Sequence, residues 1–196
     1  MRKLLFMICL IAGCTSLSSG QTPDEPKNEF FAGYSFHSAD INTLTIDPQR
    51  TGQHGVNLAY KRNLSAHVGV KIDASAHFKR DSRPLAGGQF SRQRDQYYFL
   101  GGVEFKASGS NRVTPFAQAL AGASLFRGFT TLTTPAGNVF TFDDATSFAI
   151  GVGGGLDVRA SDRIAIRLIQ ADYIPTFFGS GRQDNIRISV GVVFKR

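Results

Sequence analysis

Hydrophobic and polar residues alternate along most of this chain, and the pattern is clearest between residues 64 and 79. One alternate set there is apolar: Leu64, Ala66, Val68, Val70, Ile72, Ala74, Ala76 and Phe78. The other set is polar and includes Lys71, Asp73 and Lys79. Because successive side chains of a strand point to opposite faces, this period of two predicts a long strand with one apolar and one charged face. Such strands are typical of transmembrane β-barrels.

Eight stretches show this alternation and predict eight strands. They are residues 29–38, 53–61, 64–78, 96–106, 113–126, 146–159, 163–175 and 185–195. The connections at 62–63, 107–112 and 160–162 are short, whereas those at 39–52, 79–95, 127–145 and 176–184 are long. Short periplasmic turns and long outer loops are the asymmetry of outer-membrane barrels. We therefore predict an all-β protein, an eight-stranded antiparallel up-and-down transmembrane β-barrel with both termini on the periplasmic side.

The two predicted faces differ in charge. The apolar face carries no charged residue in any predicted strand. The opposite face carries Lys71, Asp73, Glu104, Asp157, Arg159, Arg167, Asp172 and Arg187. Burying so many charged groups in the core of a small soluble barrel costs too much free energy. We therefore expect these residues to line the lumen of a membrane barrel whose apolar face meets lipid.

Aromatic residues occur at both ends of the apolar face. The lower ring consists of Phe30, Tyr60, Phe105 and Phe194, and the upper ring of Phe36, Phe78, Tyr97, Phe148 and Tyr173. Aromatic girdles of this kind mark the two membrane interfaces of a transmembrane barrel.

The predicted strand at 163–175 changes its pattern midway. Ile164, Ile166 and Leu168 share the apolar face, but Ala171 and Tyr173 have the opposite parity. One extra residue in a strand turns all following side chains to the other face. We therefore predict a β-bulge between Leu168 and Gln170.

The first residues resemble an export signal. A charged start, Met1-Arg2-Lys3, precedes a short apolar run, and this predicts a secretory signal peptide at residues 1–20. The apolar run has roughly ten residues and is too short for a spanning helix. A short polar periplasmic tail is predicted at 21–28 and the transmembrane β-barrel domain at 29–196, which suits one domain in a chain of 196 residues.

Two cleavage sites are compatible with this leader. Small residues at Ser18 and Gly20 favour cleavage after Gly20, whereas residues 11–14 resemble a lipobox that would lipidate Cys14. Cleavage after Gly20 removes Cys9 and Cys14, the two cysteines of the chain, and leaves a mature protein without thiols.

Four short segments are typical of one group of membrane proteins. They are residues 54–63, 99–103, 114–117 and 170–173, which read His-Gly-Val-Asn-Leu-Ala-Tyr-Lys-Arg-Asn, Phe-Leu-Gly-Gly-Val, Thr-Pro-Phe-Ala and Gln-Ala-Asp-Tyr. With them the chain resembles the small eight-stranded outer-membrane β-barrel family related to the OmpA membrane domain and OmpX, over about residues 29–196. Ser189, Gly191 and Phe194 resemble a barrel-assembly signal, although Arg196 stands where that signal has an aromatic residue. The resemblance implies insertion by the barrel-assembly machinery of a bacterial outer membrane.

Candidate catalytic residues have a simpler interpretation as lumen lining. Asp73, Ser75 and His77 share one face of a predicted strand and suggest a hydrolase. Side chains two residues apart in one strand are separated by about 6.6 Å along it, so a hydrogen bond from Ser to His within the strand is strained, and no oxyanion-hole motif is evident. The four histidines lack the spacing of metal ligands. We predict no enzymatic activity, metal or cofactor.

The inward charges balance in sign and suggest a closed lumen. An eight-stranded barrel has an interior only just wide enough for its side chains. We therefore predict ion pairs that plug it, including Asp172 with Arg187 and Asp157 with Arg167. A narrow channel for ions or small solutes is the alternative.

The predicted loop at 79–95 is basic and carries Lys79, Arg80, Arg83, Arg92 and Arg94. Arginine forks bind phosphate well, so this loop is a candidate contact for lipopolysaccharide, and an ordinary solvated loop is the alternative. The formal net charge of +7 does not indicate nucleic-acid binding, because the basic residues are scattered and no nucleic-acid motif is present.

The sequence thus predicts a monomeric outer-membrane protein with a structural or surface-interaction role. Its expected partners are outer-membrane lipid and lipopolysaccharide. A conducting channel is the second hypothesis and an outer-membrane lipid-modifying enzyme is the third. Surface loops carry such functions without a readable sequence code, so the ligand is not predicted.

Overall fold

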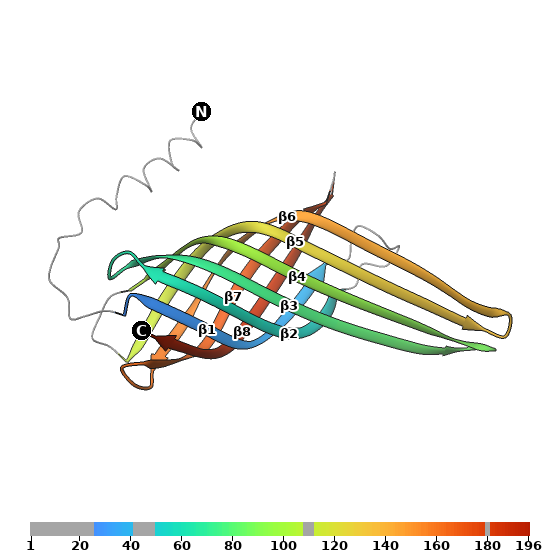
Figure 1. The fold of residues 1–196 in the computed structure, drawn as a ribbon, viewed down its shortest axis with the longest axis horizontal. Coiled ribbons are helices and arrows are strands. Elements are labelled where there is room, and N and C mark those ends of the chain that lie inside the picture. The colour runs from blue at the N-terminus through green and yellow to red at the C-terminus, as the bar shows by residue number, and fades with distance from the viewer. Residues whose placement is uncertain (1–25, 41–49, 108–111, 179–180) are drawn as a thin grey trace, which may run out of the picture.

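The computed structural model describes residues 26–40, 50–107, 112–178 and 181–196, and the predicted signal peptide, with both cleavage sites, lies outside these residues. Eight antiparallel strands close into one barrel in sequence order (Figure 1). They are β1 (Asn28–Asp40), β2 (Arg50–Asn63), β3 (Val68–Leu85), β4 (Gly88–Lys106), β5 (Val113–Thr134), β6 (Gly137–Arg159), β7 (Ile164–Phe178) and β8 (Gly181–Lys195). The predicted fold class is confirmed. In the described part of the chain, no helix is long and apolar enough to cross a membrane.

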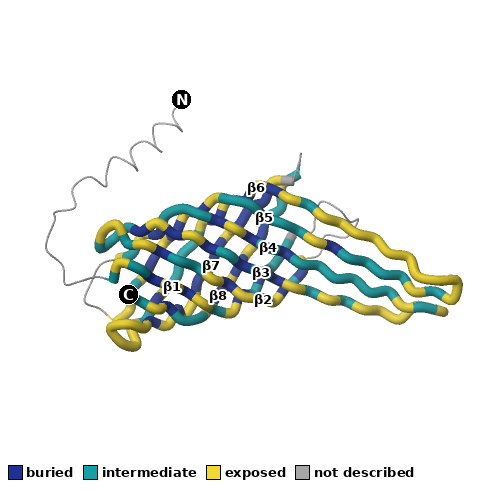
Figure 2. The backbone as a smooth tube through the Cα atoms, in the orientation of Figure 1, coloured by how far each residue is buried: buried dark blue, intermediate teal, exposed yellow. Residues whose placement is uncertain are grey.

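Burial alternates along each strand in the closed part of the barrel, as the sequence pattern predicts (Figure 2). In β3, Lys71 and Asp73 are buried in the lumen. Their neighbours Val70 and Ile72 point outward and are 44% and 60% exposed. Apolar side chains therefore cover the outside of the barrel, and polar side chains fill its interior.

The predicted β-bulge in β7 is present. The pairing of β7 with β8 shifts in register between Arg167 and Gln170. Leu168 and Ile169 are consecutive residues, yet they are 54% and 42% exposed, so both point outward at the bulge. After it, Asp172 points into the lumen and Tyr173 points outward, which restores the alternation.

The start of the third strand was predicted too early. Residues 64–67 form the turn between β2 and β3, in which the backbone amides of Leu64 and Ser65 both donate to the carbonyl of Val68. The hydroxyl of Ser65 accepts a hydrogen bond from the backbone amide of Val68 and closes the turn. Leu64 and Ala66 are apolar and continue the alternation of the strand in the sequence, but they do not pair with another strand.

Four strands extend far beyond the closed barrel, and this corrects the predicted long loops at 79–95 and 127–145. The ladder between β3 and β4 continues to Leu85 and Gly88, and the ladder between β5 and β6 continues to Thr134 and Gly137. On their other sides, β3 pairs with β2 only as far as Phe78, and β6 pairs with β7 only from Phe148. Residues 79–95 and 127–145 therefore form a four-stranded sheet, here called the protruding sheet (Figure 1).

Periodicity did not identify the protruding sheet because water reaches both of its faces. Without a buried face, a strand needs no apolar alternation. Gly87, with a φ of 83°, supplies the left-handed residue of the tight turn that joins β3 to β4. The predicted loop at 176–184 is also shorter than expected, since β7 and β8 pair as far as Phe178 and Gly181. Most of the predicted loop at 39–52 lies outside the described residues.

Candidate functional site

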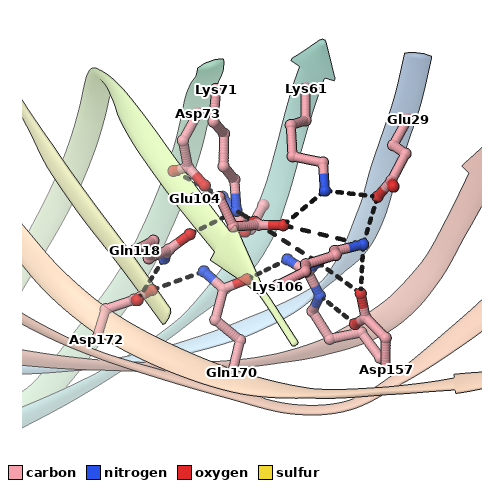
Figure 3. A network of polar contacts seen from close by, with 12 residues as sticks. Glu29, Lys61, Lys71, Asp73, Glu104, Lys106, Gln118, Asp157, Gln170 and Asp172 are labelled. Carbon is pink, nitrogen blue, oxygen red and sulfur yellow. Dashed lines mark hydrogen bonds and ion pairs between the residues drawn. The ribbon is translucent and has the colours of Figure 1, made fainter. Parts of the chain in front are cut away.

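Twelve polar side chains, contributed by all eight strands, form a continuous set of contacts in the lumen, here called the lumen network (Figure 3). They are Glu29, Lys61, Lys71, Asp73, Glu104, Lys106, Gln118, Asp157, Arg167, Gln170, Asp172 and Arg187. Five of the twelve are acidic and five are basic, so the formal charges cancel. Such cancellation is needed because isolated charges are expensive to hold away from water.

Glu104 lies at the centre of the basic side chains. Its Oε1 accepts a hydrogen bond from Lys61 Nζ and its Oε2 accepts one from Lys71 Nζ, both at 3.0 Å. Lys71 also donates to Gln118 Oε1 at 2.6 Å, which extends the contacts from β3 to β5. Glu104 is 1% exposed, so these donors replace the water that its carboxylate would otherwise bind.

Arg187 connects opposite parts of the barrel wall. Its Nη1 donates to Asp73 on β3 at 2.7 Å, and its Nη2 donates to Asp172 on β7 at 2.9 Å. The hydroxyl of Ser75 accepts a further hydrogen bond from Nη1. The side chain of Arg187 is completely buried. The predicted pair with Asp172 is therefore present, and Asp73 is a second partner that the sequence analysis did not assign to Arg187.

Arg167 makes the other predicted ion pair. Its Nε and Nη2 donate to the two carboxylate oxygens of Asp157 at 2.8 and 3.1 Å, a bidentate geometry that favours arginine. The guanidinium also lies over the ring of Phe116, with 4.0 Å between its central carbon and the ring centroid. This stacking explains how a cation and large aromatic groups share one narrow lumen.

Three charged residues of the lumen network were missed by the sequence analysis. Lys106 contacts Glu29 at 2.6 Å and Asp157 at 3.3 Å, and Lys61 contacts Glu29 at 3.2 Å. All three lie close to strand ends, at the end of the barrel that carries the short turns. The sequence pattern could have identified them. Each lies in a predicted strand at an even number of residues from a side chain predicted to point into the lumen, so each is expected to point inward too.

Arg159 is the predicted lumen residue that the structure places elsewhere. It is the last residue of β6 and is exposed. The extra residue at the register shift is Leu168 of β7, so β6 keeps its parity and Arg159 pairs with the inward residue Ala165. Because Arg159 is the last residue of the strand, its long side chain lies at the exposed rim of the barrel and not in the buried part of the lumen. The other seven predicted lumen charges are buried inside.

The lumen network leaves little free space. A cavity lined by Lys71, Glu104 and Arg167 has a volume of about 10 Å³, at the lower limit for one water molecule. Gln118 and Gln170 both donate to the carboxylate of Asp172 and fill the space between β5 and β7. Side chains therefore occupy the cross-section of the barrel at this level.

The residues that suggested a hydrolase are engaged in other contacts. Asp73 and Ser75 both accept hydrogen bonds from Arg187. Nε2 of His77 contacts the hydroxyl of Ser35, on β1, at 2.9 Å. Among the residues that the structure describes, no group of three or more His, Cys, Asp or Glu side chains has the arrangement of a metal site.

The basic residues at 79–95 lie on the protruding sheet and divide between its faces. Lys79 pairs with Arg94 and Asp81 with Arg92 in the ladder between β3 and β4, which places these four residues on one face together with Arg83. Arg80 has the opposite parity and is exposed on the other face. We call the first face the basic face of the protruding sheet.

Ion pairs neutralise part of the basic face. Asp81 contacts Arg94 at 2.6 Å and Lys79 at 3.7 Å. Across the whole protruding sheet, the basic face carries Lys79, Arg83, Arg92 and Arg94 against Asp81 and Asp143, whereas the other face carries Arg80 and Arg127 against Asp95 and Asp144. The basic face therefore has the positive excess, and the other face is balanced.

Comparisons with solved structures identify the architecture. The chain is similar to Ail, the attachment invasion locus protein of Yersinia pestis, in a crystal structure with the heparin analogue sucrose octasulfate: the TM-score is 0.61, the identity 17%, and the match covers 87% of this chain and 100% of Ail. Neisserial surface protein A matches with a TM-score of 0.55 and 13% identity, over 89% of this chain and 100% of that protein. The fold is that of the small eight-stranded outer-membrane β-barrels. A scan with protein-family models and a search of curated proteins found no match.

The aromatic residues of this outer-membrane barrel lie on its outer surface. Phe30, Phe78, Phe105, Phe148, Tyr173 and Phe194 are exposed, whereas Phe36, Tyr60 and Tyr97 are half-buried. The ring of Phe30 packs on Tyr60 with a centroid distance of 4.9 Å, and Phe78 packs on Tyr97 at 6.1 Å. Phe177 stacks on Phe148 at 6.3 Å and extends the upper set of aromatic residues, a position that the sequence analysis did not include.

Proposed function

We propose that this barrel is a surface-interaction protein of the bacterial outer membrane, with a closed lumen and a protruding sheet that binds the phosphorylated sugars of lipopolysaccharide. The observation that carries the proposal is the separation of the charges into two groups. Charges in the lumen are paired and cancel, whereas the basic face of the protruding sheet retains a positive excess in contact with water.

The closed lumen is supported by the contacts of Arg187 and Glu104. These side chains join β8 to β3 and β7, and β4 to β2 and β3. An ion that crosses the barrel would have to displace several buried, charge-assisted hydrogen bonds at once, each worth more than an ordinary hydrogen bond. A surface role is therefore favoured over conduction.

The choice of lipopolysaccharide is supported by position and charge. The protruding sheet continues the long strands beyond the upper aromatic residues, in the region where the sugars of the outer leaflet lie. Arg83 and Arg92 lie on the basic face, and Arg83 is exposed. Planar guanidinium groups bind phosphate and sulfate oxygens bidentately. Ail, which shares this fold, was crystallised with a sulfated sugar.

Planar-bilayer recordings test the closed lumen. We expect the purified barrel to show no steady conductance in either orientation, because the lumen network occupies its cross-section. A larger-pored outer-membrane porin, recorded under the same conditions, shows that the bilayers report conduction, and flotation of the barrel with its vesicles before fusion shows that it has inserted. Steady single-channel steps from the wild-type protein would support the narrow channel instead.

Binding to immobilised lipopolysaccharide tests the basic face. The double change Arg83→Gln and Arg92→Gln should weaken binding at least tenfold, since each cation near an anionic surface contributes about 1 kcal/mol. Added salt should weaken wild-type binding in the same direction. The matched control is Arg80→Gln with Arg127→Gln, which removes two arginines from the other face. Equal losses in the two double variants would show that binding depends on overall charge and not on this face.

A further inference from the structure

The outer surface of the barrel contains an apolar furrow that crosses four strands. It has a volume of about 650 Å³ and runs over β1, β2, β3 and β4. Its sides are outward residues, among them Leu58, Ile72 and Phe99, which are 55%, 60% and 56% exposed. Its depth comes from the small outward residues Ala32, Ala74 and Gly101, which stand among these large side chains.

The floor of the furrow is backbone. Phe31, Ala59, Asp73 and Leu100 line it and pair in one row across the four strands. Their side chains are directed inward, so only their main chain faces outward. The row spans three inter-strand spacings, about 14 Å. Because this row crosses strands that tilt by about 35–45° in such barrels, the furrow runs obliquely along the barrel wall.

The furrow lies beside a basic rim. Phe30, Tyr60 and Phe194 form its lower side and pair as neighbours on β1, β2 and β8. Arg62 lies two residues beyond Tyr60 on the same outward face. It is exposed and pairs with Asn28. Lys27 is exposed next to Asn28.

Among the described residues, the acidic residue closest in sequence to this rim does not neutralise it. Glu29 points into the lumen, where Lys61 and Lys106 already hold its carboxylate. Arg62 has no ion pair with any residue in the described part of the chain. An exposed cation thus lies next to an apolar furrow that faces the hydrocarbon.

We propose that the furrow and this rim form a binding site for one anionic glycerophospholipid of the periplasmic leaflet. An acyl chain lies in the furrow, and the phosphate is held by Arg62 with Lys27. The apolar lining selects an acyl chain, because a polar occupant would lose hydrogen bonds to water without replacement. The rim lies at the end of the barrel that carries the short turns, which is the periplasmic side, so the occupant is a phospholipid and not the lipid A of the opposite leaflet.

Retention of lipid measured by native mass spectrometry tests this site. The wild-type barrel is reconstituted in vesicles of equal parts phosphatidylglycerol and phosphatidylcholine with identical acyl chains, then released into a mild detergent. We expect one retained lipid per barrel, with phosphatidylglycerol preferred. Arg62→Gln should lower that preference about fivefold, the change that corresponds to one cation near an anionic surface. Arg163→Gln, which removes an exposed cation from the same end of the barrel on the turn between β6 and β7, should leave it unchanged.

Filling the furrow separates this site from general lipid contact. Ala74→Phe places a ring in the furrow and should abolish retention of both lipids. Ala76→Phe makes the same change at the next outward position of β3, outside the furrow, and should retain lipid as the wild type does. Gly101→Leu is a second filling variant, since a Cβ at Gly101 meets only the carbonyl of Lys71, at 3.9 Å. Heat-dependent migration on denaturing gels confirms that each variant is folded.

Three results would overturn the proposal. Equal loss of lipid in Ala74→Phe and Ala76→Phe would show ordinary annular lipid. Equal loss of preference in Arg62→Gln and Arg163→Gln would show a general charge effect. Displacement of phosphatidylglycerol by lipopolysaccharide in mixed vesicles would assign the furrow to the other leaflet. This site is independent of the proposed function, because it uses no side chain of the lumen network or of the basic face, and Asp73 contributes only its main chain to the floor.

Discussion

Replacing Arg187 by alanine should lower the free energy of unfolding by about 3 to 5 kcal/mol. Arg187 is completely buried and holds two carboxylates, Asp73 and Asp172. Its removal leaves both acids in the lumen without their cation, and uncompensated buried charge is the largest penalty available in such a site. Urea unfolding from lipid vesicles, followed by circular dichroism, measures the loss.

A double-mutant cycle shows whether the loss comes from the unpaired acids. Asp172→Ala combined with Arg187→Ala should be more stable than the sum of the two single losses predicts, with full recovery prevented because Asp73 still lacks its partner. Arg182→Ala is the matched control: Arg182 lies on the same strand and contacts Asp184 at 2.8 Å, but it is 57% exposed. It should have little effect. Additive single losses, or an equal loss for Arg182→Ala, would contradict the proposed role of the lumen network.

Val152→Arg should lower the free energy of unfolding by about 2 to 4 kcal/mol, the cost of placing a cation on the lipid face near the middle of the bilayer. Val152 is 54% exposed and lies on β6 between the aromatic residue Phe148 and the end of the strand. It contacts lipid in the membrane, so the apparent exposure does not mean contact with water. The same unfolding measurement in vesicles gives the value.

The chain offers a matched control on the same strand. Val139 is 59% exposed, a fraction close to that of Val152, but it lies on the protruding sheet beyond Phe148. Val139→Arg should therefore change the stability by no more than about 1 kcal/mol, as for residues outside the hydrocarbon. Equal effects of Val139→Arg and Val152→Arg on stability would show that the membrane does not cross β6 at the level predicted here.

Local sequence determined the strands of the closed barrel and the direction of their side chains. Lipid on one side and a polar lumen on the other impose a strict period of two, so Val70, Lys71 and Ile72 have their faces set by parity alone. The same reasoning located the bulge of β7, because an extra residue leaves a visible break in the pattern. The pairs of Arg187 with Asp172 and of Arg167 with Asp157 also followed, since each joins residues of consecutive strands.

Only the tertiary structure decided the contacts that cross the lumen and the form of the protruding sheet. Arg187 reaches Asp73 because barrel closure brings β8 beside β1 and across from β3, and nothing in the spacing of 114 residues encodes this distance. Residues 79–95 look like a loop because both faces of the protruding sheet meet water, where strand pairing requires no apolar alternation. The position of a residue along a strand predicts the direction of its side chain wherever the two faces of the strand meet different environments. Closure of the barrel, tilt of its strands and exposure of a sheet to water on both faces arise only in the assembled structure.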